Sequence, residues 1–123
     1  MYNTLTLTSA LAALKKGDIT IDEIYRDTFA AIAKDNSELN IYLTLNESAL
    51  EQAKTRQQLP LMGLPIAVKD NFCTKDLRTT ASSKLLESFT PQYESTVTSR
   101  LLAAGGTIIG ETNMDAWAHG SST

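Results

Sequence analysis

Apolar residues recur at every third or fourth position through the first part of the chain, which is the spacing of one face of an α-helix. The first such series predicts a helix that starts at a Thr8 or Ser9 cap and ends at Gly17, just after two lysines. Its apolar positions are Leu7, Leu11 and Leu14.

A second helix is predicted from Thr20, because Thr20 and Glu23 have the three-residue spacing of a capping box. Its apolar positions follow the period of a helix that buries one face. They are Ile21, Ile24, Tyr25, Thr28, Phe29 and Ile32.

Residues 41–45 are short, β-branched and aromatic, so they predict a strand. We expect Asn46 to cap a third helix that continues toward position 58. No chemical motif precedes residue 60, and we therefore interpret residues 1–59 as a helical scaffold.

Two short apolar runs without alternation, at 66–68 and 107–110, are typical of strands buried on both faces of a sheet. Pro65 fits the first position of the earlier strand, where its missing N–H costs little. A short helix is expected near 82–86, and a longer one starts at Ser95 or Thr96, carries Val97, Leu101 and Leu102, and stops at Gly105-Gly106. This order predicts an α/β fold, in which N-terminal helices precede a βαβ unit with parallel strands.

Both predicted strands end in polar residues, and ligands of parallel sheets bind beyond the carboxyl ends of the strands. Lys69 and Asp70 follow the first strand, whereas Thr112, Asn113 and Asp115 follow the second. We expect these residues to share one edge of the sheet. A lysine directly behind an apolar run is placed where burial can remove its water, which lowers the pKa of the ammonium group and can leave a neutral amine that accepts a proton. A lysine that ends the strand and points to solvent is the alternative.

The remaining chemical candidates are weaker. Asp70 and Asp115 could form a carboxylate pair, yet each also fits a turn or a cap. Gly120-Ser121-Ser122 offers hydroxyls without a neighbouring base. The last candidates are one histidine, one cysteine and two aromatic residues. His119 lacks further ligands for a metal, Cys73 fits a buried inert thiol, and Phe89 and Trp117 fit a core or an interface.

Composition narrows the classes of function. The 123 residues carry 11 Lys+Arg against 14 Asp+Glu, a net charge of −3, which argues against a nucleic-acid-coating surface. No apolar run approaches the length of a membrane span, no signal peptide is visible at the start, and one cysteine forms no intrachain disulfide. We therefore expect a cytoplasmic protein, with an organelle matrix as the open alternative, and with no metal and no membrane contact.

Five segments, taken together and in this order, resemble the amidase-signature family. They are MGLPIAVKDNF at 62–72, TTASSKLL at 79–86, AGGTIIG at 104–110, TNMD at 112–115 and GSST at 120–123. Within the family they are most similar to the A subunits of glutamyl-tRNA(Gln) amidotransferases. The resemblance implies a mixed-sheet α/β/α fold, of which residues 60–123 would supply one strand with a lysine, a crossover helix and a second strand.

The resemblance also implies a Ser–cis-Ser–Lys mechanism of amide hydrolysis, in which Lys69 takes the place of the relay lysine. Asn113, Asp115, Ser121 and Ser122 would belong to the wall of the substrate pocket. Both catalytic serines of the family lie beyond the position that matches Thr123. We therefore expect an N-terminal portion of one amidase-signature domain that is inactive by itself. Alone, it would leave the apolar faces of its two strands partly uncovered and would be marginal or dimeric.

In that branch of the family, glutamine is hydrolysed and its ammonia converts Glu-tRNA(Gln) to Gln-tRNA(Gln). The resemblance implies B and C partner subunits, with ATP, magnesium and the tRNA bound by a partner and no cofactor bound by this chain. Glu111, where those relatives usually carry lysine, and the AWAH sequence at 116–119 depart from the pattern. A stand-alone amidase of small amides and a naturally short, non-catalytic binding module are the alternatives.

Overall fold

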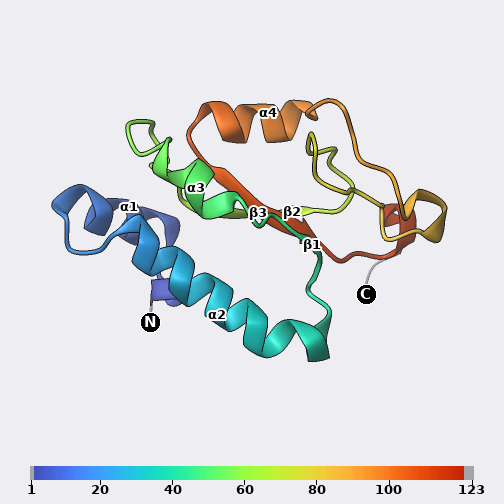
Figure 1. Ribbon diagram of the computed structural model, residues 1–123, viewed down its shortest axis with the longest axis horizontal. Helices are drawn as coiled ribbons and strands as arrows, with labels where there is room; N and C mark the ends of the chain where they lie inside the picture. The colour runs from blue at the N-terminus through green and yellow to red at the C-terminus, as the bar shows by residue number, and fades with distance from the viewer. Residues whose placement is uncertain (1, 121–123) are drawn as a thin grey trace.

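Helices lie on both faces of a three-stranded sheet in the computed structural model, which describes residues 2–120 (Figure 1). One face carries α1 and α2 and the other carries α4, while α3 packs against α2, since its Ala49 and Ala53 belong to the same buried cluster as Ile24 and Tyr25. The elements are η1 (Tyr2–Thr4), α1 (Leu7–Lys16), α2 (Ile21–Leu39), β1 (Tyr42–Leu45), α3 (Ala49–Lys54), β2 (Pro65–Lys69), η2 (Lys84–Leu86), α4 (Thr96–Ala103), β3 (Thr107–Thr112) and η3 (Ala116–Ala118).

The strand order is β1-β3-β2, so the last strand in the chain lies at the centre of the sheet. β2 and β3 are parallel and are joined through α4, which confirms the predicted βαβ unit. β1 pairs with β3 in the antiparallel direction, and the sheet is therefore mixed. The parallel register sets Lys69 opposite Thr112, which brings the carboxyl ends of β2 and β3 to the same edge.

Local sequence signals fix the ends of the first two helices. Thr6, and not Thr8 or Ser9, caps α1 by accepting a hydrogen bond from the Ser9 N–H. Gly17 ends α1 in the left-handed conformation with φ 76°, as predicted. The predicted capping box of α2 is confirmed, since Thr20 and Glu23 each accept a hydrogen bond from the other's backbone.

The core on the α1–α2 side forms where α2 packs against the sheet. Ile21, Ile24 and Tyr25 are buried, and Ile109 of β3 belongs to the same cluster. The predicted stripe of α2 is thus its buried face. In α1 the buried residue is Ala10, whereas Leu7 is 54% exposed.

Tyr25 ties α2 to the segment that leads into β2, because its hydroxyl donates a hydrogen bond of 2.9 Å to the Gly63 carbonyl. Burial raises the pKa of Tyr25 to about 12, so the hydroxyl remains a donor at neutral pH. We expect Tyr25→Phe to leave the Gly63 carbonyl unpaired and to lower the free energy of unfolding by about 1–2 kcal/mol. Urea denaturation measures the change, and Tyr93→Phe on an exposed tyrosine is the matched control.

Three sequence predictions need correction in their details. The side chain of Asn46 does not cap α3. Its oxygen accepts from the Ser48 N–H and its amide group donates to the Ile108 carbonyl, so it fastens the loop to β3 instead. α3 also ends at Lys54, short of position 58, and the helix expected near 82–86 is the single 3₁₀ turn η2.

The predicted apolar stripe of α4 is only partly correct. Thr98 is the buried residue of this helix, and its hydroxyl donates to the Cys73 carbonyl, whereas Val97 is 44% exposed.

Of the two parallel strands expected to have partly uncovered apolar faces, only β2 has an exposed apolar residue. Residues 107–110 are buried because β3 is central, while Ala67 of the edge strand β2 is exposed.

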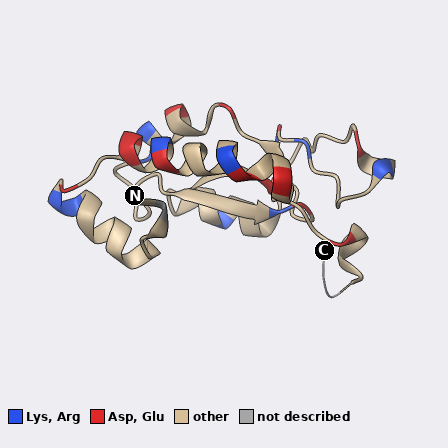
Figure 2. Cartoon of the chain, turned by 90° about the horizontal axis from the view of Figure 1, so that it is seen from below, with Lys and Arg blue, Asp and Glu red and all other residues tan. Residues whose placement is uncertain are grey.

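Acidic and basic residues are interspersed along α2, as Figure 2 shows, and do not gather into one basic face there. No helix among residues 2–120 is both long enough and apolar enough to cross a membrane.

Candidate functional site

The site begins where β2 and β3 end together. Lys69 is the last residue of β2, and its carbonyl accepts hydrogen bonds from the Asn71 and Phe72 N–H groups at 2.7 and 3.0 Å, which turn the chain at once. The Asp70 N–H donates to the Thr112 carbonyl at 3.1 Å. The predicted grouping of Lys69 and Asp70 with the residues after β3 is therefore confirmed for the backbone.

The side chain of Lys69 is exposed, as is Ala67 two residues earlier along the strand. Both lie on one face of β2, since side chains alternate along a strand. The desolvation expected of Lys69 is therefore not supplied by residues 2–120.

Asp70 differs from its neighbour, because its side chain is completely buried. The carboxyl group accepts hydrogen bonds from the Thr80 N–H at 2.8 Å, from the Thr80 hydroxyl and from the Ser82 N–H at 2.9 Å. Asp115 instead accepts a hydrogen bond from the Gly120 N–H and precedes η3. No hydrogen bond joins the two carboxyl groups among the described residues, since Asp115 is engaged by the nearby Gly120, whereas Asp70 is held by a loop ten to twelve residues along the chain.

Asn113 lines a small pocket of about 200 Å³. Its side-chain oxygen accepts hydrogen bonds from the Ser82 hydroxyl at 3.1 Å and from the Met114 N–H at 2.8 Å. Arg78 and Lys84 also line the pocket. Ser121 and Ser122, the other predicted residues of the pocket wall, lie outside the described residues.

Sequence reasoning missed Thr80 and Ser82 as members of this edge. The only signal was their place in the TTASS segment, which carries no periodic pattern and no familiar chemical motif of its own. The structure brings them to Asp70 through a loop that the chain forms between β2 and α4.

Glu111 is a second buried carboxyl group, on β3 and with no exposed surface. Its Oε1 accepts a hydrogen bond from the Thr74 hydroxyl, while Oε2 has no hydrogen-bond partner. Burial, aided by the charges of Asp70 and Glu94, raises the pKa of Glu111 to about 8. This side chain is therefore largely protonated at neutral pH.

The weaker candidates are dispersed. His119 is exposed, and residues 2–120 contain no group of three or more His, Cys, Asp or Glu side chains that could hold a metal ion. Cys73 is half-buried rather than buried, with its sulfur 3.7 Å from the Tyr93 hydroxyl oxygen. Phe89 and Trp117 are 36% and 46% exposed, so neither belongs to the core.

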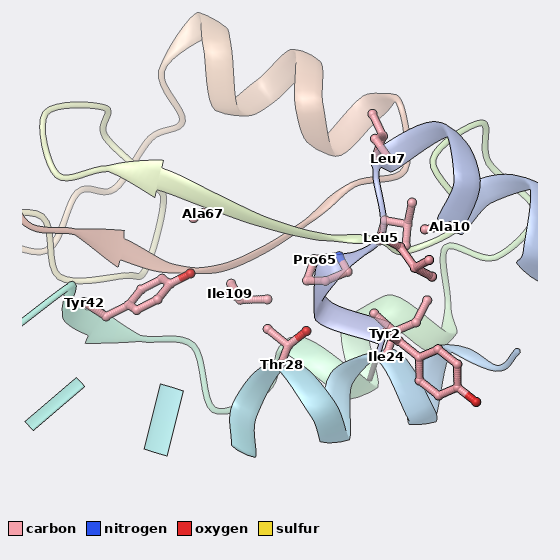
Figure 3. A pocket seen from close by; sticks show the side chains of 11 residues that line it. Tyr2, Leu5, Leu7, Ala10, Ile24, Thr28, Tyr42, Pro65, Ala67 and Ile109 are labelled. Atoms are coloured by element: carbon pink, nitrogen blue, oxygen red, sulfur yellow. The ribbon is translucent and has the colours of Figure 1, made fainter. Parts of the chain in front are cut away.

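A larger cavity of about 310 Å³ lies between the sheet and α1–α2 (Figure 3). Pro65 and Ala67 of β2 face Ile24 and Thr28 of α2 across it. Its wall is apolar apart from hydroxyl groups, and it therefore contains neither a nucleophile with a base nor a set of metal ligands. The candidate site remains the polar edge at Lys69.

The sequence that forms this edge is similar to known proteins. The Amidase family model matches residues 23–123. The A subunit of the glutamyl-tRNA(Gln) amidotransferase of Lactobacillus delbrueckii subsp. bulgaricus is 44% identical over 122 residues, which are 99% of this chain and 25% of that protein. The protein of the same name from Natranaerobius thermophilus is 42% identical over 97% of this chain and 26% of its own length. The chain thus spans about a quarter of the length of these relatives.

Solved structures agree on the fold. A peptide amidase in complex with the competitive inhibitor chymostatin has a TM-score of 0.87 at 26% identity, covering 96% of this chain and 26% of its own. The A subunit of the glutamyl-tRNA(Gln) amidotransferase of Thermotoga maritima has a TM-score of 0.75 at 20% identity, covering 98% of this chain and 25% of its own.

Proposed function

Because the chain belongs to the amidase family, we propose that it supplies the lysine-bearing part of an amide-hydrolysing site, with Lys69 as the proton relay. The observation that carries this proposal is the position of Lys69. It ends β2 at the polar edge shared with β3, inside the segment that the family model matches.

The proposed chemistry needs a hydroxyl nucleophile that loses its proton as it attacks an amide carbonyl. A neutral lysine amine can accept that proton, through a bridging serine, and return a proton to the leaving ammonia. We assign the two serines to polypeptide outside residues 1–123. The same polypeptide would cover the exposed Lys69 side chain and disfavour its ammonium form.

We further propose glutamine as the substrate, with ammonia passed on for the conversion of Glu-tRNA(Gln) to Gln-tRNA(Gln). The support is the identity of 44% and 42% to proteins that carry the name of that amidotransferase's A subunit. B and C subunits would then be partners, ATP and magnesium would act in a partner, and the complex would work in the cytoplasm. Asn113 and Asp115 would lie in the wall of the substrate pocket.

The test uses the gene product at its encoded length, purified with the subunits that accompany it. We expect an intact mass several times the 13.4 kDa of this chain and release of ammonia from glutamine. The 123-residue chain alone is expected to release none. Glutamine hydrolysis by the isolated chain would contradict the assignment of the serines.

A stand-alone amidase of small amides is the second candidate. It is favoured by the higher TM-score with the peptide amidase, 0.87 against 0.75 with the Thermotoga maritima protein. Affinity capture of the native protein separates the two candidates. Recovery of stoichiometric partner subunits favours the amidotransferase, whereas a single polypeptide that hydrolyses small amides favours the stand-alone amidase.

A further inference from the structure

The carboxyl group of Asp70 is an unusual feature of the polar edge, since a buried charged group is costly unless hydrogen bonds replace its water. The side chain is 0% exposed. Oδ1 accepts a hydrogen bond from the Thr80 N–H, and Oδ2 accepts from both the Thr80 hydroxyl and the Ser82 N–H. All of its donors come from one loop, about ten residues along the chain.

That loop has an unfavourable backbone shape at the point where Asp70 holds it. Ala81 and Ser82 are consecutive non-glycine residues with φ 49° and 50°, in the left-handed region. Such residues are sterically disfavoured and persist where the surroundings fix them. The Ala81 N–H donates to the Asp70 carbonyl at 2.8 Å, so both the backbone and the side chain of Asp70 hold the loop.

The loop in turn holds the segment that follows β3. The Ser82 hydroxyl donates to the Asn113 side-chain oxygen and accepts from the Met114 N–H, each at 3.1 Å. The Trp117 N–H donates to the Ala81 carbonyl at 3.0 Å. One hydrogen-bonded chain therefore runs from the end of β2 through the loop to the end of β3.

We propose that Asp70 is a positioning residue for Lys69, which fixes the carboxyl end of β2 to the 80–82 loop and, through Ser82, to Asn113. The inference rests on the proposed role of Lys69. Asp70 touches no substrate in this scheme. It acts by holding the backbone from which the Lys69 amine reaches its serine, and a displacement of about 1 Å in such a geometry can cost about a hundredfold in rate.

The experiment uses the full-length amidase and measures kcat and KM for glutamine hydrolysis. Asp70→Asn has the same shape, yet its amide offers one oxygen where two accepting oxygens are needed, so one donor meets an NH₂ group. We expect kcat to fall about a hundredfold while KM stays within about twofold of its original value.

Thr80 supplies the matched pair if Asp70→Asn fails to fold. Thr80→Val removes the hydroxyl donor to Asp70 and retains the shape, whereas Thr80→Ser retains the donor. We expect Thr80→Val to lower kcat about tenfold without changing KM, and Thr80→Ser to retain kcat within about twofold. A general loss of packing would affect Thr80→Ser as well, because that change removes a methyl group.

Lys69→Ala in the same protein separates the two possible failures. If Lys69→Ala is inactive while Asp70→Asn and Thr80→Val keep the original kcat, the positioning role of Asp70 is wrong and the proposed function stands. Equal losses in Thr80→Val and Thr80→Ser would also overturn the positioning role. If Lys69→Ala remains active, the proposed function itself is wrong.

Discussion

Lys69→Ala in the full-length amidase is expected to lower kcat for glutamine hydrolysis by at least about a thousandfold, with little change in KM. The reason is that the proposed mechanism gives the Lys69 amine the role of proton acceptor at the carboxyl end of β2. Asp70 beside it is buried and engaged by Thr80 and Ser82, and so cannot take over the role. Steady-state ammonia release measures both constants.

Two further variants separate proton transfer from charge. Lys69→Arg keeps a positive charge but cannot be deprotonated at physiological pH, so we expect it to be as inactive as Lys69→Ala. Lys75→Ala removes an exposed lysine a few positions further along the chain and is expected to retain full activity. Activity of Lys69→Ala within about tenfold of the original enzyme, about 1.4 kcal/mol of barrier, would contradict the relay role.

The parts of the fold that the sequence predicted are those fixed by short-range chemistry. The Thr20–Glu23 capping box, the Gly17 stop and the apolar stripe of α2 depend on residues within a few positions of each other. The parallel strands β2 and β3 were predictable from two uninterrupted apolar runs with a helix between them. Their shared carboxyl edge then follows from topology, and with it the location of Lys69.

The missed features depend on contacts between distant segments. Asn46 has the residue type of a helix cap, but the Ile108 carbonyl, 62 residues away in the chain, engages its amide. Thr98 is buried in α4 because its hydroxyl reaches the Cys73 carbonyl, a contact that no helical period reveals. The burial of Asp70 likewise requires the loop donors Thr80 and Ser82, so its environment could not be predicted from the turn signal alone.

Glu111→Gln is expected to remove a pH dependence of stability that the buried carboxyl group creates. The folded-state pKa of Glu111 is raised to about 8 from the usual 4.5, chiefly by burial. Below pH 4.5 the group is protonated in both states and costs nothing. As pH rises from 4.5 to 8 the unfolded chain loses this proton first, so the free energy of unfolding falls. Because a difference of one in pKa between the two states corresponds to about 1.4 kcal/mol, and the two values differ by about 3.5, we expect a loss on the order of 5 kcal/mol by pH 9.

Glutamine is the appropriate replacement because its side-chain oxygen can still accept the hydrogen bond from the Thr74 hydroxyl while carrying no titratable proton. Urea denaturation at pH 5 and pH 9 measures the difference, with the exposed Glu47→Gln as the control. We expect Glu111→Gln to match the original chain at pH 5 and to exceed its stability at pH 9, whereas Glu47→Gln follows the original chain throughout. Parallel pH curves for Glu111→Gln and the original chain would mean that Glu111 is ionised in the folded protein. Its carboxylate would then need a donor for Oε2, which has no hydrogen-bond partner here.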